Sequence, residues 1–214
     1  LVDIPKDVTA AKCEFTPASP CAKKAAPIPG ADELEQALAL LRASKRPFLY
    51  AGGGVISSGA SGELAAFAEK LDAPVSCSLM CQGGFDQQGS RYLGMLGMHG
   101  TKASALAMKH CDLFVAVGTR FSDRVTCNAN LFGKHFPIIQ IDIDPAEFNK
   151  NVMVDVELRG DAQQVLESLN AALEQQSHPD WMRDIASWKE NYPLFQKPSV
   201  PGCVTPQEVL ETLD

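Results

Sequence analysis

Residues 112–118 read Asp-Leu-Phe-Val-Ala-Val-Gly, a nearly continuous apolar run that ends on a glycine. A strand that is apolar on both faces is typical of a parallel sheet with helices on both sides. Further strands are predicted at 47–51, 74–80, 138–144 and 154–158. The strand pattern therefore indicates an α/β fold with a buried sheet.

Segments with helical spacing of apolar residues separate these strands. Helices are predicted to begin near Ala31 and to occupy 62–71, 101–110 and 161–175. Strands that alternate with helices are joined by right-handed crossovers. We therefore expect a doubly wound, mainly parallel sheet with helices on both faces, a Rossmann-like α/β domain.

The two ends of the chain differ from this pattern. Residues 1–30 hold a short strand-like stub, Leu1–Pro5, followed by a stretch rich in alanine, proline and lysine, and we expect the end of a preceding domain and a linker. Residues 31–176 form the expected α/β domain. Residues 177–214 are predicted to be a connector, with Pro193–Pro201 at its centre, and the start of a following domain. A helix is expected there after Thr205, a good N-cap. Because the first residue is leucine rather than methionine, we expect a piece of a longer protein.

Composition excludes several classes of function. The formal net charge of −7 and the pI near 5.1 argue against a nucleic-acid partner. No apolar run in the sequence is long enough to span a membrane, and we expect no signal peptide. The seven cysteines include no CxxC pair, and Cys77-x-x-x-Cys81 is weak grounds for zinc, so we expect no metal and a reducing cytoplasm.

The predicted strand ends carry residues suited to a ligand, because ligands bind beyond the carboxyl ends of parallel strands. Gly52–Gly54 follow one strand, either to let backbone N–H groups approach a pyrophosphate or simply to form a tight turn. The glycine-rich run Gly94–Thr101 precedes a helix and includes His99, either a cleft residue or a hydrogen-bonded loop histidine. Arg120 is placed to contact a phosphate or a ring, or alternatively to pair with Asp123.

Acidic residues follow the later strands. One of Asp142 and Asp144 is expected to accept from ribose hydroxyls while the other caps the turn at Pro145. Asp161 is either a ligand contact, an N-cap of the following helix, or both. No nucleophile with a general base is apparent, so no catalytic residue is assigned. Together the strand ends indicate a dinucleotide site.

Six motifs in order resemble the middle of acetolactate synthase (acetohydroxyacid synthase), and the resemblance covers nearly the whole chain. They are LVDIPKDV (1–8), PFLYAGGGV (47–55), LGMLGMHGT (93–101), VGTRFSDRVT (117–126), IIQIDIDPAEFNKN (138–151) and RGDA (159–162). Members of that family join a pyrimidine-binding domain, a central FAD domain and a diphosphate-binding domain. The resemblance implies that thiamine diphosphate and Mg²⁺ belong to flanking domains of a homo-oligomeric transferase. This parent enzyme would condense two 2-oxo acids for branched-chain amino-acid or acetoin pathways.

The resemblance also implies a set of FAD contacts in this chain, with FAD in a structural rather than a redox role. They are Gly52, Gly53, Gly54, Leu96, Gly97, Met98, His99, Gly100, Thr101, Gly118, Thr119, Arg120, Asp123, Arg124, Asp142, Ile143, Asp144 and Asp161. The piece lacks the glutamate that activates thiamine and the Gly-Asp-Gly metal motif, so we expect it to be inactive alone. Where relatives more often read GARFDDRVTG, this chain reads GTRFSDRVTC at 118–127.

Two alternatives remain at this stage. The chain resembles, more distantly, the nucleotide domain of NAD-dependent sirtuins, although it lacks their CxxC pairs. It is also similar to the middle domain of thiamine diphosphate decarboxylases, which serves mainly as a nucleotide-free scaffold.

Overall fold

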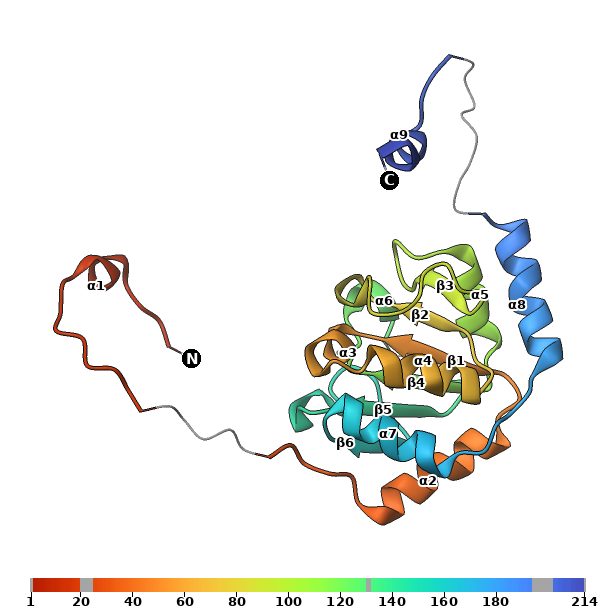
Figure 1. Ribbon diagram of the computed structural model, residues 1–214, viewed down its shortest axis with the longest axis horizontal. Helices are drawn as coiled ribbons and strands as arrows, with labels where there is room; N and C mark the ends of the chain where they lie inside the picture. The colour runs from red at the N-terminus through yellow and green to blue at the C-terminus, as the bar shows by residue number, and fades with distance from the viewer. Residues whose placement is uncertain (1, 20–24, 130–131, 194–201, 214) are drawn as a thin grey trace.

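A computed structural model describes residues 2–19, 25–129, 132–193 and 202–213. Within these ranges six strands form one parallel sheet in the order β3-β2-β1-β4-β5-β6 (Figure 1). The strands are β1 (Pro47–Ala51), β2 (Val75–Cys77), β3 (Tyr92–Met95), β4 (Leu113–Val117), β5 (Ile138–Asp142) and β6 (Val156–Arg159). The fold is therefore the doubly wound α/β architecture that the strand pattern predicts.

Helices connect the strands, and further helices lie near both ends of the chain. The α-helices are α1 (Lys6–Ala10), α2 (Ala31–Ala43), α3 (Gly53–Ser58), α4 (Ser61–Lys70), α5 (Lys102–His110), α6 (Asp123–Thr126), α7 (Ala162–Ala172), α8 (Pro179–Asn191) and α9 (Pro206–Leu213). Two 3-10 turns, η1 (Leu79–Cys81) and η2 (Pro145–Glu147), follow β2 and β5.

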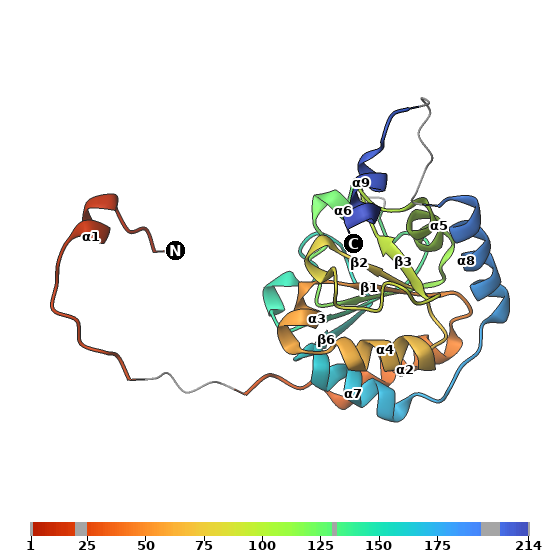
Figure 2. The same cartoon turned by 45° about the horizontal axis from the view of Figure 1, so that its top comes forward.

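Two apolar cores cover the two faces of the sheet, as the apolar strands require. One core joins the sheet to α2, α4 and α7 through side chains such as Leu41, Phe67 and Leu166. The other joins it to α5 and α8 through Phe114 and Trp181, among others. Figure 2 shows α2, α4 and α7 below the sheet, with α5 and α8 on the opposite side.

Helix α8 is anchored by its tryptophans. The Trp181 side chain is 1% exposed, and its indole N–H donates to the carbonyl of Pro47 at 2.9 Å. The Arg46 guanidinium lies 5.4 Å from the Trp181 ring centroid, and the Trp188 ring meets Trp181 edge-on at 5.7 Å. The packed body of the α/β domain therefore extends past residue 176 and includes α8.

Several local expectations differ from the structure. Strand β2 is shorter than predicted because the chain turns into η1 after Ser78, and β5 ends at Asp142 rather than at residue 144. Strand β3 and helices α3 and α6 were not predicted. The stub at the chain start is no strand over Val2–Pro5, and the short exposed α1 follows it.

The predicted C-terminal helix is confirmed as α9. Thr205 accepts from the Glu208 N–H, while the Glu208 carboxylate accepts from the Thr205 N–H at 2.7 Å. These reciprocal bonds form a capping box. The connector predicted at 193–201 lies, from residue 194 onward, outside the described residues.

Candidate ligand-binding site

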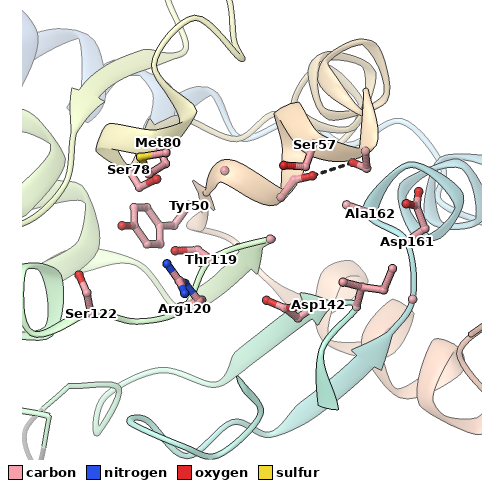
Figure 3. A pocket seen from close by; sticks show the side chains of 16 residues that line it. Tyr50, Ser57, Ser78, Met80, Thr119, Arg120, Ser122, Asp142, Asp161 and Ala162 are labelled. Atoms are coloured by element: carbon pink, nitrogen blue, oxygen red, sulfur yellow. Dashed lines mark hydrogen bonds between the residues drawn. The ribbon is translucent and has the colours of Figure 1, made fainter. Parts of the chain in front are cut away.

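A pocket opens at the carboxyl edge of the sheet. The strand order reverses between β1 and β4, and such a switch point is where doubly wound sheets bind ligands. The pocket has a volume of about 480 Å³, within the range of small-molecule sites. Its lining comes from five strand ends: Tyr50, Gly53, Gly54, Ser57, Ser58, Ser78, Met80, Gly118, Thr119, Arg120, Ser122, Asp142, Ile143, Gly160, Asp161 and Ala162. Figure 3 shows Ser78 and Met80 at one end and Asp161 with Ala162 at the other.

Glycines let the ends of β1 and β4 approach each other at the floor of this pocket. A Cβ on Gly54 would lie 2.6 Å from the Cα of Gly118, and one on Gly52 would lie 2.2 Å from the Gly118 carbonyl oxygen. The N–H groups of Gly52 and Gly54 already donate to Val117 and Gly118. The structure therefore gives these two glycines a packing role, and neither has a backbone N–H left for a pyrophosphate.

Arg120 extends from the loop after β4 into the pocket lining. Its side chain is exposed and makes no ion pair or hydrogen bond with any described residue. The alternative pairing with Asp123 is not formed, because the Asp123 carboxylate instead accepts from the N–H of Arg124 at 2.9 Å. Arg120 is therefore a cation at the switch point that no described residue neutralises.

The acids after β5 and β6 divide between capping and the pocket. Asp144 caps η2 by accepting from the Ala146 N–H at 2.9 Å, and it lies outside the lining. Asp142 lines the pocket and is 8% exposed. Burial raises the pKa of Asp142 above its ordinary value, although the N–H of Asp144 opposes the shift. Donors from a ligand would therefore stabilise the ionised form of Asp142.

Asp161 is the N-cap of α7, and it also lines the pocket. Its carboxylate accepts from the Gln163 N–H at 3.0 Å, which caps α7, and the same residue lines the pocket. Only one carboxylate oxygen is used in the cap. The other oxygen is without a hydrogen bond in the described part of the chain.

Sequence reasoning missed the hydroxyl-bearing residues of the lining, notably Tyr50, Ser78 and Ser122. Burial raises the pKa of Tyr50 to about 12, so its phenol stays protonated at neutral pH. Tyr50 and Ser78 lie within predicted strands, and Ser122 lies four residues beyond the predicted strand 112–118. That position was a usable signal.

The turn 96–101 lies beside the pocket and does not line it. The Met98 N–H donates to the Arg124 carbonyl at 2.8 Å, and a Cβ on Gly97 would lie 2.4 Å from that same oxygen. The Thr101 hydroxyl caps α5 and donates to the Leu93 carbonyl at 2.5 Å. Leu96 is buried, Gly100 donates to the Gly97 carbonyl, and His99 is exposed. The structure therefore brings this turn against Arg124, with its glycines in packing roles.

Features that would favour another kind of site are not found in the described ranges. No group of three or more His, Cys, Asp or Glu side chains there could hold a metal ion. Cys77 and Cys81 are both buried, and a hydrogen bond with Cys81 together with burial raises the pKa of the Cys77 thiol. No helix over the same residues has the length and apolar character needed to cross a membrane.

Comparison with known proteins gives consistent matches. Residues 34–169 match the family model for the thiamine pyrophosphate enzyme, central domain. The acetolactate synthase large subunit of Parasynechococcus marenigrum (strain WH8102) is 39% identical over 98% of this chain and 35% of that protein. The isozyme 2 large subunit of acetolactate synthase from Escherichia coli (strain K12) is 42% identical over 90% of this chain and 36% of that protein. A probable acetolactate synthase large subunit of Methanocaldococcus jannaschii is 45% identical over 79% of this chain and 28% of that protein. The chain thus spans about a third of the length of these curated relatives.

Proposed function

Because this chain belongs to the family of thiamine pyrophosphate enzyme central domains, we propose that it is the FAD-binding central domain of an acetolactate synthase-like enzyme. One observation carries the proposal. The pocket crosses the switch point of the sheet and places the guanidinium of Arg120, which pairs with no described residue, between a hydroxyl-rich end and an acidic end.

The lining fits the parts of FAD. A guanidinium is the side chain best shaped for phosphate oxygens, which suits Arg120 to the diphosphate. Carboxylates accept hydrogen bonds, which suits Asp142 and Asp161 to ribose hydroxyls and the adenine amino group. The opposite end offers Met80, which is 71% exposed, as an apolar surface for a flavin ring. The cavity of about 480 Å³ holds part of such a ligand, and its open side leaves the rest toward neighbouring surfaces.

The remaining predicted contacts lie around this pocket. Gly53, Gly118, Thr119 and Ile143 line it, whereas Gly52, Asp123, Arg124 and Asp144 support its walls. The turn 96–101 contacts two neighbours of the pocket: the Met98 N–H donates to the Arg124 carbonyl, and the Leu96 N–H donates to the carbonyl of Cys77 at the end of β2. In the proposal it supports the flavin end.

In this function FAD supplies structure rather than redox chemistry. Thiamine diphosphate and Mg²⁺ would be held by flanking pyrimidine- and diphosphate-binding domains of a homo-oligomeric parent enzyme. That parent would be a transferase that joins two pyruvate-type 2-oxo acids, in branched-chain amino-acid or acetoin pathways. This chain would bind and orient FAD and would not catalyse the condensation alone.

Titration with FAD tests the proposal. We expect saturable binding, which quenching of the flavin fluorescence would measure. ADP should compete with FAD, because ADP is the half of FAD that the proposal assigns to the acidic end of the pocket. We also expect no acetolactate from pyruvate with thiamine diphosphate and Mg²⁺. Absence of FAD binding would favour the nucleotide-free scaffold, and turnover by this chain alone would refute its assignment as a central domain only.

A further inference from the structure

The loop after β4, residues 118–122, uses its backbone carbonyls in an unusual way. The Gly118 carbonyl accepts from the N–H of Gly54 at 3.0 Å. The Thr119 carbonyl accepts from the side-chain amide of Gln140 at 3.3 Å. The carbonyls of the next two residues, Arg120 and Phe121, both accept from the side-chain amide of Asn151, at 3.3 and 3.2 Å. The carbonyls of Thr119, Arg120 and Phe121 are therefore held by two side chains that do not line the pocket.

The N–H groups of three of these peptides have no hydrogen-bond partner among the described residues. The chain has no cis peptide bond among its described residues, and in a trans peptide the N–H points opposite to the carbonyl. The N–H groups of Arg120, Phe121 and Ser122 therefore point away from the two amides. None of the three donates a hydrogen bond within the described ranges. Arg120 and Ser122 are exposed and Phe121 is buried, so the run of donors lies at the surface of the pocket region, where an incoming ligand can reach it.

Backbone strain at Phe121 supports a ligand role for this loop. Phe121 has a φ of +46°, a left-handed conformation that costs free energy for any residue with a Cβ. Its ring is 2% exposed and packs 6.0 Å from Phe114 and 5.7 Å from Phe132, which holds the strained residue in place. Successive N–H groups around left-handed residues form concavities that bind anions. Such strain clusters at ligand sites.

We propose that Gln140 and Asn151 are positioning residues that turn the N–H groups of Arg120, Phe121 and Ser122 toward the pocket as a site for a phosphate group. Neither positioning residue lines the pocket. The inference rests on the proposed function, because the phosphate is that of the bound nucleotide. It adds to that function a backbone donor set and the two side chains that hold it.

The state of Gln140 agrees with a positioning role. Its side chain is fully buried, and its Oε1 has no hydrogen-bond partner in the described part of the chain. A buried amide with an unpaired oxygen destabilises the fold, and an apolar side chain would avoid that cost. The hydrogen bond that the Gln140 amide makes with the described residues is the one it donates to the Thr119 carbonyl.

The test replaces Asn151 with aspartate and compares ligands with and without phosphate. Asn151→Asp keeps the shape of the side chain but loses the donor and repels both carbonyls. The matched control is Asn191→Asp, the same change of charge on α8, where among the described residues the amide donates only to Ser187 of its own helix. The ligands are ADP and adenosine, and their binding is monitored through the backbone amide NMR signals of residues 119–122. The affinity of the full chain for FAD is measured as well.

We expect ADP to shift the amide signals of Arg120, Phe121 and Ser122 downfield in the unmodified chain, and adenosine to leave them in place. Asn151→Asp should abolish these shifts and weaken ADP and FAD about tenfold or more, the effect of losing one charge-assisted hydrogen bond. It should leave adenosine affinity unchanged. The control should behave like the unmodified chain. A role limited to stability would lower the melting temperature without changing the ratio of ADP to adenosine affinity.

The outcomes separate this inference from the proposed function. If FAD binds but ADP leaves these amides in place, the backbone site is wrong and the FAD function stands. If FAD does not bind at all, the proposed function fails and this inference fails with it. Should Asn151→Asp lose its cooperative melt, Gln140→Met decides, because it removes the other donor and also removes the unpaired buried oxygen. Unchanged ADP affinity in a folded Gln140→Met would exclude a positioning role for Gln140.

Discussion

Replacing Arg120 with alanine should weaken FAD binding while leaving the folded chain as stable as before. The Arg120 side chain is exposed and has no partner among the described residues, so its removal leaves no buried group unpaired. Surface substitutions of this kind change the free energy of unfolding by about 0.5 kcal/mol or less. The stability of the apo protein therefore serves as an internal check on the variant.

The loss of affinity follows from the chemistry of the contact. A hydrogen bond to a charged group contributes about 1.5–3 kcal/mol, which corresponds to roughly a ten- to a hundredfold change in Kd. Because the guanidinium is exposed, salt screens part of this attraction, and the Debye length is only about 8 Å at physiological ionic strength. We therefore expect the loss to lie near tenfold at physiological salt and to be larger at low salt.

Calorimetric titration of FAD at low and physiological salt measures both quantities. The control is Arg183→Ala, which makes the same change of charge on α8, where Arg183 pairs with Asp180 at 2.8 Å and is 74% exposed. Arg183→Ala should bind FAD as the unmodified chain does. Equal weakening by both variants would show that net charge, rather than contact, governs binding. Unchanged affinity in a folded Arg120→Ala would remove Arg120 from the site.

Three further predictions concern the acids, the glycine crossing and pH. Asp161→Asn should keep the melting temperature of the apo protein, because asparagine caps a helix about as well as aspartate does. Asp142→Asn should lower the affinity for FAD more clearly than Asp161→Asn does. FAD titration and thermal melts of both apo variants check this, and wild-type affinity in both would show that the ligand contacts lie elsewhere. Gly118→Ala should destabilise the fold by roughly 2–5 kcal/mol in chemical denaturation, because its φ is +57° and the new Cβ would lie 2.6 Å from the Cα of Gly54. The control Gly62→Ala should not destabilise the fold, because no atom outside its own helix lies within 4 Å of the position of its Cβ. Burial holds the pKa of His178 below its ordinary value, so the unfolded chain binds a proton at this residue at a higher pH than the folded chain does. The free energy of unfolding should therefore fall as the pH drops below about 6.5. His178→Gln should make that fall shallower in thermal melts across pH, and an identical slope would assign the loss to other groups.

The sheet could be predicted from the sequence because its strands are short apolar runs that end on glycine, serine or aspartate. Strand β1 and the neighbouring β4 follow this rule closely and form within a residue of the predicted bounds. Strand β3 does not follow this pattern, because it contains Gly94 with a φ of +84°, and a glycine inside a short segment predicts a loop rather than a strand. Helix α3 opens on two glycines, which favour turns in isolation and are helical here because the crossing with Gly118 fixes them.

The candidate site was predicted in part. Strand-end reasoning located Arg120, Asp142 and Asp161, because topology alone brings the carboxyl ends of parallel strands together. It could not assign hydrogen bonds, such as the one from the Gly100 N–H to the Gly97 carbonyl inside the turn 96–101, and the FAD contacts expected in that turn stay a prediction. The role proposed for Asn151 depends on a contact across about thirty residues of sequence, and no local pattern reveals such a contact.

Both tryptophans of the chain lie on α8, on the sheet face that carries Phe114, and their rings are 5.7 Å apart. Ultraviolet emission from this protein therefore reports almost entirely on one helix. A red shift during heating would record the detachment of that helix from the sheet, since Trp181 would then meet water for the first time. The same signal is a poor monitor of the strand ends, where no indole is present, so spectroscopic studies of ligand uptake need the emission of the ligand itself.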